Sequence, residues 1–149
     1  MKNIIGEFRY NQVFWVSFTA WFVAQTLKGI LCFIKTGKID FRRFVGAGGM
    51  PSSHSAFVSA LAFGIGEMEG WSSPVTALAL VFAFIVMYDA AGVRLAASKQ
   101  AASLNKLVDE LFEEGEFHQE RLKELLGHTP VEVFCGALLG VVISALLLR

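Results

Sequence analysis

The chain has 149 residues, of which 54% are hydrophobic and 17% are charged. That length suits one domain, but the composition is too apolar for an ordinary soluble domain, and a soluble helical bundle with unusually large cores is the alternative. The formal net charge is zero, so nothing in the charge indicates a nucleic-acid partner.

Long apolar runs with few or no charges separate the clusters of charged residues. A helix needs about 20 apolar residues to cross the core of a bilayer. Three runs reach that length, and the second in chain order is shorter, so it spans only if its ends sit at the interfaces. The sequence predicts an all-α integral membrane bundle, a single domain over 1–149, with four transmembrane helices at about 11–34, 52–68, 72–92 and 130–148.

Lysine and arginine cluster in two connecting segments, residues 35–50 and 93–128. Basic residues mark the cytoplasmic side of a membrane protein. We therefore expect both segments in the cytoplasm, both chain ends on the other side, and Lys28 at the cytoplasmic face. An amphipathic helix over 95–112 is too polar to span, and we expect it to lie against that face or to pair with a partner.

A turn that contains glycine leads into the second span, where residues 48–56 read Gly-Gly-Met-Pro-Ser-Ser-His-Ser-Ala. The first turn of a helix presents N–H groups without intrahelical acceptors and the positive end of the dipole, which together attract an anion. Ser52 and Ser53 add hydroxyl donors, and His54 can carry a proton near neutral pH. The segment predicts either a phosphate site served by a histidine or a capped helix whose histidine is incidental.

Small residues recur at a spacing of four in the second span, at Ala56, Ala60 and Gly64, and in the last span, at Gly136 and Gly140. Such faces let helices approach closely. They predict tight packing at mid-depth, which leaves the membrane interface as the place for a site. They also offer a face for a homodimer.

The third span ends in Met-Tyr-Asp-Ala-Ala-Gly-Val-Arg, which puts the ionisable Asp89 at or just below the membrane surface. Such residues usually have a partner and a role. Arg94 or Lys28 is the natural counter-ion. An ion pair that only fixes the bundle is the alternative.

The last span opens with Gly-His-Thr-Pro-Val-Glu. Thr129 and Glu132 match a capping box, and Pro130 takes the first helical position. Glu132 also lies one turn from His128, where a carboxylate can hold an imidazole in one tautomer and stabilise its cation. Both roles can hold at once.

No metal or other cofactor is expected. The acidic residues and the histidine within 109–120 lack the spacing of metal ligands. Cys32 and Cys135 lie inside predicted spans with no Cys-x-x-Cys spacing, so we expect them to be small buried apolar residues.

Together these motifs resemble those of the type 2 phosphatidic acid phosphatases, relatives of the vanadium haloperoxidases, and in particular their small, divergent branch in bacteria and plastids. The family carries a Lys followed seven positions later by Arg-Pro, then Pro-Ser-Gly-His, then Ser-Arg-five-His-three-Asp. The pattern of the branch matches at Gln25 with Lys28, at Gly48–Ser55, at Met87–Arg94 and at Leu125–Val133.

The resemblance implies a role for each matched residue. His128 takes the place of the nucleophile that forms a phosphohistidine, Glu132 that of the Asp that orients it, and His54 that of the general acid. We expect phosphate to be bound by Lys28, Ser52, Ser53 and Arg94, with support from Gln25, Asp89 and Asn105.

The chain departs from the family pattern at two positions. Ser53 replaces the Gly of the second motif, and Leu122 stands where the last motif has Arg. Arg94 could supply that charge from the third span. Lys35 has the first motif's spacing to a basic residue, but the pattern of the branch favours Lys28.

The resemblance implies a metal-independent lipid phosphate phosphatase in a bacterial inner or plastid membrane, with its active face cytoplasmic. Its substrate would be phosphatidate, phosphatidylglycerophosphate or a polyprenyl phosphate, and Phe41, Phe44 and Phe57 would ring a site for a headgroup whose tail stays in lipid. Two alternatives remain open: an inactive family member acting as a membrane scaffold, and a transport module for an anionic headgroup.

Overall fold

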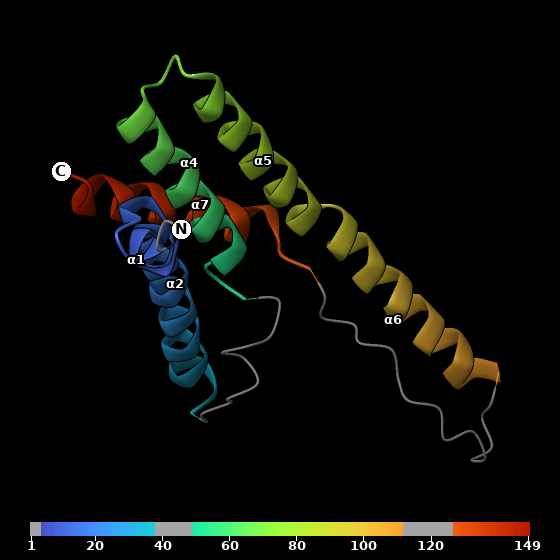
Figure 1. Cartoon of the computed structure of the whole chain (residues 1–149). Helices are drawn as coiled ribbons and strands as arrows, with labels where there is room; N and C mark the ends of the chain where they lie inside the picture. Colours follow the sequence, from blue (N-terminus) through green and yellow to red (C-terminus); the bar gives the residue numbers. More distant parts are fainter. Residues whose placement is uncertain (1–3, 38–48, 112–126) are drawn as a thin grey trace.

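The computed structural model describes residues 4–37, 49–111 and 127–149, and these ranges form helices and connecting turns without a strand (Figure 1). The helices in chain order are α1 (Ile4–Arg9), α2 (Gln12–Thr36), α4 (Ser53–Glu69), α5 (Pro74–Ala91), α6 (Val93–Leu111) and α7 (Pro130–Leu147). The predicted all-α class is confirmed. The short α1 was not predicted.

Capping side chains determine where the long helices begin. Asn11, Ser52, Ser73 and Thr129 each accept a hydrogen bond from a backbone N–H of the following turn. Each bond satisfies a donor that has no acceptor within its own helix. Gly37 ends α2 at a φ of 66°, a left-handed conformation that glycine adopts without steric cost.

Three stretches of the described residues are long and apolar enough to cross a membrane: Gln12–Ile34, Pro74–Val108 and Pro130–Leu147. Helix α4 stands where the second span was predicted, but its 17 residues extend only about 26 Å at 1.5 Å per residue, against a hydrocarbon core of about 30 Å. The predicted second span is therefore a helix that is short for crossing a bilayer.

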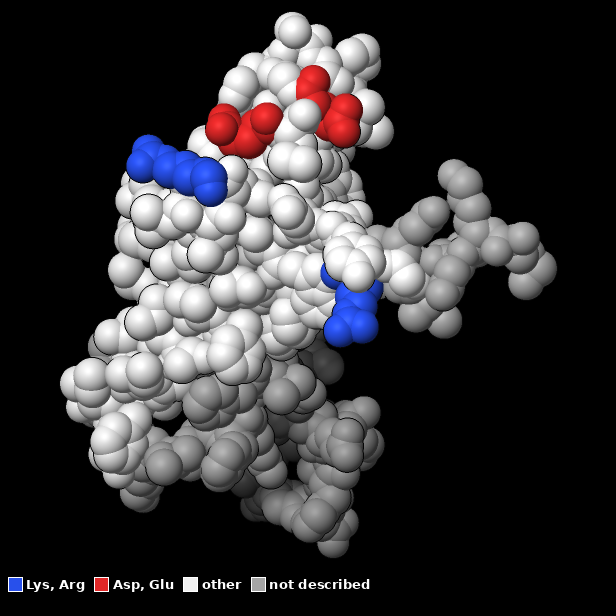
Figure 2. Space-filling view, turned by 60° about the vertical axis from the view of Figure 1, so that its left-hand side comes forward, with Lys and Arg blue, Asp and Glu red and all other residues white. Residues whose placement is uncertain are grey.

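Large apolar side chains cover the outside of the spans, as Leu78 and Phe134 do with 70% and 69% of their surface exposed. The face shown in Figure 2 carries few charged side chains among its described residues. Apolar surface of this extent needs a cover, and three helices of spanning length and composition indicate that lipid supplies it.

Helix α4 lies in the middle of the bundle and packs against α2, α5 and α7 (Figure 1). Most of its buried positions are Ala, Ser or Gly, so its neighbours approach its backbone closely. Ser144 of α7, for instance, donates a hydrogen bond of 3.1 Å to the Ala60 carbonyl oxygen.

Helices α4 and α7 approach each other closely enough to require glycine. A Cβ added at Gly136 would collide with the Ser52 carbonyl oxygen, and one added at Gly140 would collide with that of Ala56. The small-residue faces predicted from the sequence therefore pack against each other within one chain. A homodimer stays a prediction, and it would need another surface.

Helix α6 continues from α5 and projects away from the other helices (Figure 1). Among the described elements it packs only against α5. Leu104, Leu107 and Val108, part of the predicted apolar stripe, are exposed. An amphipathic helix is thus present at the predicted place, and its position against a membrane face stays a prediction.

Candidate functional site

Two helix beginnings and one helix end meet at one end of the bundle. The Ser52 N–H, just before α4, donates to the carbonyl oxygen of Glu132 in α7 at 3.0 Å, and the His128 N–H donates to the carbonyl oxygen of Ala90 in α5 at 3.1 Å. The two predicted motifs, around His54 and around His128, are therefore tied side by side by backbone hydrogen bonds.

The two histidines face each other across this junction. Their ring centroids are 6.2 Å apart, and the ring planes meet at 64°. His54 is exposed in the first turn of α4, whereas His128 is only 1% exposed just ahead of α7. Two imidazoles at this separation can act on opposite sides of one small group, one shielded from water and one open to it.

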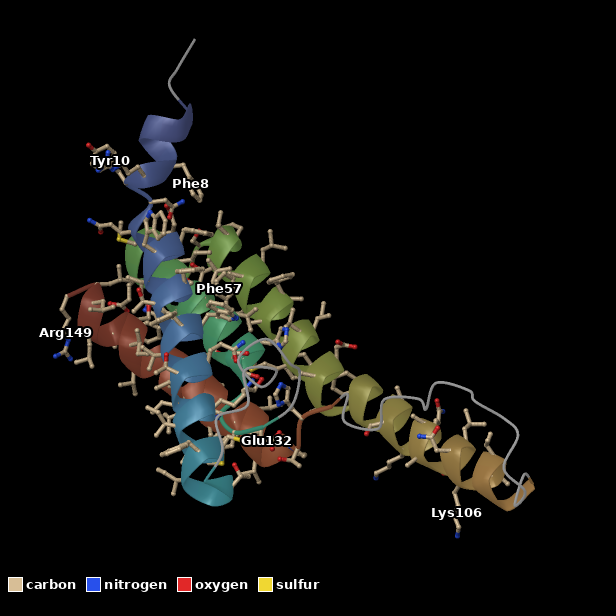
Figure 3. All side chains as sticks on the ribbon, turned by 90° about the horizontal axis from the view of Figure 1, so that it is seen from below. Phe8, Tyr10, Phe57, Lys106, Glu132 and Arg149 are labelled. Carbon is tan, nitrogen blue, oxygen red and sulfur yellow. The ribbon has the colours of Figure 1, made fainter. Side chains whose placement is uncertain are left out.

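Glu132 lies at the beginning of α7 (Figure 3), where its carboxylate contacts both the helix cap and His128. Its Oε2 lies 3.1 Å from His128 Nδ1 and 3.1 Å from the Thr129 backbone nitrogen. Thr129 Oγ1 in turn accepts from the Glu132 N–H at 3.3 Å, which completes a capping box. Because an ionised carboxylate can only accept, this contact favours the tautomer of His128 that carries its proton on Nδ1 and its lone pair on Nε2.

Lys28 reaches the same end of the bundle from α2. The residue is 3% exposed, and its Nζ has no hydrogen-bond acceptor among the described residues. Because an ammonium in such a place is costly unless it is paired, Lys28 is suited to bind an anion that enters the site.

Glycine is needed where the loop before α4 passes Lys28. Gly49 has a φ of 88°, and a Cβ there would lie 3.3 Å from Lys28 Cγ. Both the backbone conformation and the space favour glycine. The second glycine of the motif thus lets the loop lie against the stem of the lysine.

The serines of the motif are buried and partly committed to the helix start. Ser52 Oγ accepts from the Ser55 N–H at 3.3 Å and from Ser55 Oγ at 3.0 Å. Ser52, Ser53 and Ser55 are each at most 2% exposed. The amides of Ser53 and His54 come before the first intrahelical hydrogen bond, from Ala56 to Ser52, so they point out of the helix at its positive end.

The structure places the remaining predicted residues less closely together. Gln25 is buried on α2 one turn before Lys28, and Asp89 is half-buried near the end of α5. Asn105 is buried on α6, and the packing of the described elements does not bring that helix to the histidines. Arg94 lies in the first turn of α6, and its side chain is outside the described part.

Several other predicted features lie outside the described residues or take no part in the junction of the two histidines. Phe57 is half-buried on α4 and packs against the cluster that α4 and α5 form. The cysteines are not joined in a disulfide, and no three His, Cys, Asp or Glu side chains of the described ranges lie together as metal ligands would. Outside the description lie Phe41, Phe44, Leu122, residues 112–120 and the side chain of Lys35.

Sequence reasoning missed the contacts that hold the site together. The hydrogen bond from His128 to Ala90 and the close approach of Gly136 to Ser52 were not predicted. The small residues of α7 were a signal for the second contact, but spacing alone does not name the partner helix. No sequence signal pointed to the first.

Comparisons with known proteins agree with this architecture. The family model described as "Divergent PAP2 family" matches residues 9–143. A Bacillus subtilis (strain 168) protein named "Uncharacterized membrane protein YuiD" is 42% identical over 142 residues, covering 88% of this chain and 90% of that protein. No solved structure matches the chain. With its helices of spanning length, the chain is an integral membrane protein, and it belongs to the divergent PAP2 family.

Proposed function

We propose that the protein is a lipid phosphate phosphatase that hydrolyses a phosphomonoester through a phosphohistidine on His128. One observation carries this proposal: His128, oriented by Glu132 at 3.1 Å, faces His54 across 6.2 Å at the beginnings of two helices. Membership of the divergent PAP2 family supports the same class of chemistry.

In the first step, Nε2 of His128 attacks phosphorus in line with the ester oxygen. A nitrogen–phosphorus bond forms and the bond from phosphorus to the leaving oxygen breaks. Protonated His54 gives its proton to the departing alkoxide, which leaves as an alcohol. Glu132 stabilises the charge that develops on the His128 ring, much as a carboxylate does in a catalytic triad.

In the second step, water attacks phosphorus and the nitrogen–phosphorus bond breaks. His54, now neutral, takes the proton from this water, so inorganic phosphate leaves and both histidines return to their starting states. General acid–base catalysis of this kind contributes about 10²- to 10⁴-fold to a rate. The same two side chains thus complete the cycle with no group consumed.

The charge on the phosphoryl oxygens would be stabilised by groups already in place. Lys28 would supply a full positive charge, and the amides of Ser53 and His54 would supply donors at the positive end of α4. Preorganised donors of this kind act most strongly where water is scarce. The apolar surface around the spans suits a substrate whose hydrocarbon tail remains in the membrane.

Release of inorganic phosphate by the purified protein tests the proposal. A panel of phosphatidate, phosphatidylglycerophosphate and a polyprenyl phosphate would be offered in detergent, with EDTA and without added metal. We expect release from at least one lipid, loss of release in His54→Ala and His128→Ala, and retention in His118→Ala, which removes the remaining histidine of the chain.

Four outcomes would contradict the proposal. Full activity in His128→Ala would show that His128 is not the nucleophile, and sensitivity to EDTA would point to metal chemistry. No release from any lipid by folded protein would favour the scaffold. Movement of an anionic headgroup across proteoliposomes without hydrolysis would favour the transport module.

A further inference from the structure

One buried serine at the start of α4, Ser55, has no role in the chemistry proposed above. It stands in the first turn of the helix, is 0% exposed, and forms two hydrogen bonds with the capping residue Ser52. The Ser55 N–H donates to Ser52 Oγ at 3.3 Å, and the Ser55 hydroxyl donates to the same oxygen at 3.0 Å. The bond from the N–H is the one that caps a helix. The bond from the hydroxyl is additional to the cap.

These two bonds leave the Ser52 hydroxyl a single direction for its own hydrogen. A serine hydroxyl has one hydrogen to donate and two lone pairs that accept, and Ser55 occupies both lone pairs of Ser52 Oγ. The hydrogen therefore points away from the first turn of α4. It has no acceptor among the described residues, although Ser52 is 0% exposed. Because a buried donor without an acceptor costs free energy, the Ser52 hydroxyl is suited to donate to an anion.

Backbone contacts hold this hydroxyl at the junction of α4 and α7. The Ser52 N–H donates to the Glu132 carbonyl oxygen at 3.0 Å, and the Ser52 carbonyl oxygen accepts from the Ala56 N–H at 3.1 Å. Gly136 packs against the same carbonyl group. With the backbone held in this way, the orientation of the hydroxyl depends on its contacts with Ser55.

We propose that Ser55 is a positioning residue, which directs the hydroxyl hydrogen of Ser52 toward a phosphoryl oxygen of the substrate. This inference rests on the proposed function, because it needs a phosphoryl group in the site. Ser55 itself does not touch the substrate, since its hydroxyl hydrogen is donated to Ser52 Oγ. The Ser52 hydroxyl adds a neutral donor to the charge of Lys28, and a donor that is already oriented needs no reorganisation when the anion enters.

Binding of inorganic phosphate to the full chain in detergent, measured by isothermal titration calorimetry, tests the proposal without requiring turnover. Ser52→Ala removes the donor and should weaken binding about 10- to 100-fold, the range for a hydrogen bond to a charged group. Ser55→Ala keeps the donor but frees its rotation, and should weaken binding about 2- to 10-fold. Ser55→Cys fills a similar volume and donates only weakly, so it should fall in the same range as Ser55→Ala.

A double variant separates positioning from a purely structural role. If Ser55 acts only through the Ser52 hydroxyl, adding Ser55→Ala to Ser52→Ala should weaken phosphate binding no further. A purely structural loss would lower Tm without this dependence on Ser52. Ser59→Ala is the control, because Ser59 is buried one turn further along α4 and its hydroxyl donates to Met87 Sδ at 3.7 Å. It should bind phosphate as the wild type does.

Unchanged phosphate affinity in both Ser55 variants, or no phosphate binding by the wild type, would overturn the proposal. Tighter binding by Ser55→Ala would also overturn it, because Ser52 would then donate to Ser55 rather than accept from it. So would an equal further loss in the double variant, because Ser55 would then act independently of Ser52. Absence of lipid phosphate release by a wild type that shows the expected binding pattern would count against the phosphatase alone and would support the role of Ser55.

Discussion

Replacing Lys28 by methionine should separate stability from function. The side chain is 3% exposed, and its ammonium has no hydrogen-bond acceptor among the described residues. Methionine has a similar length and no charge. The folded protein without ligand should therefore gain stability, while the site loses the charge that we expect to hold phosphate.

The size of both effects follows from the burial of Lys28. Burying an ion costs on the order of several kcal/mol, so replacing this ammonium by an apolar side chain of similar length should be neutral or stabilising, and each kcal/mol raises Tm by about 2–4 °C for a chain of this size. A ligand at 100 times its Kd stabilises by about 2.7 kcal/mol. Saturating phosphate should thus raise the Tm of the wild type by roughly 5–10 °C and should leave that of Lys28→Met nearly unchanged.

Thermal unfolding in detergent, followed by tryptophan fluorescence with and without inorganic phosphate, measures both effects. Lys99→Met, which removes an exposed lysine of α6, is the control and should respond to phosphate as the wild type does. A Lys28→Met protein that unfolds below the wild type and still gains stability from phosphate would refute the reasoning about this lysine.

Three further substitutions test how the site is built. Gly136→Ala should move α7 away from the Ser52 carbonyl oxygen by on the order of 1 Å, which can lower the rate about 100-fold and costs about 1–3 kcal/mol in strain. Val142→Ile, on the exposed side of α7, is the control. Equal Tm and equal rate in the two variants would contradict the close packing of α4 and α7. Glu132→Gln should lower phosphate release by about 10²- to 10⁴-fold because His128 loses its charged acceptor, and a near-normal rate would count against that role. Thr129→Ala should cost about 1 kcal/mol of stability through the lost cap yet keep the rate within a few-fold, so its inactivation would show that the cap also orients the histidine.

The helices were predictable because the sequence marks their beginnings. Asn11, Ser52, Ser73 and Thr129 each stand just before an apolar run, and each caps a helix in the structure. The capping box at the start of α7 was likewise readable as Thr-x-x-Glu. Local hydrogen bonds of this kind depend on residues three or four apart, which a sequence displays directly.

The packing around α4 was not predictable to the same degree. Its small residues predicted close approach of a neighbouring helix, but only the structure shows that this neighbour is α7, which packs against them through Gly136 and Gly140. The short length of α4 also made it a doubtful span from sequence, and the structure gives it a central position instead. Which helices pack together depends on contacts between residues far apart in the chain, and periodicity does not record them.

The candidate site was likewise predictable from the sequence only in part. His54, His128, Glu132 and Lys28 were all singled out from motifs, and the structure gathers them at one end of the bundle. That His128 would be buried while His54 stays exposed could not be read from the motifs. This difference depends on how deeply each helix beginning sits in the bundle.

Trapping the covalent intermediate tests the central claim most directly. The purified protein would be mixed with a phosphomonoester lipid labelled in its phosphoryl group, quenched in alkali within milliseconds to seconds, and digested for mass spectrometry. The account predicts a label on His128 that is stable in alkali and labile in acid, absent from His128→Ala and present in His118→Ala. A label on another residue, or turnover with no labelled histidine at any time, would contradict it.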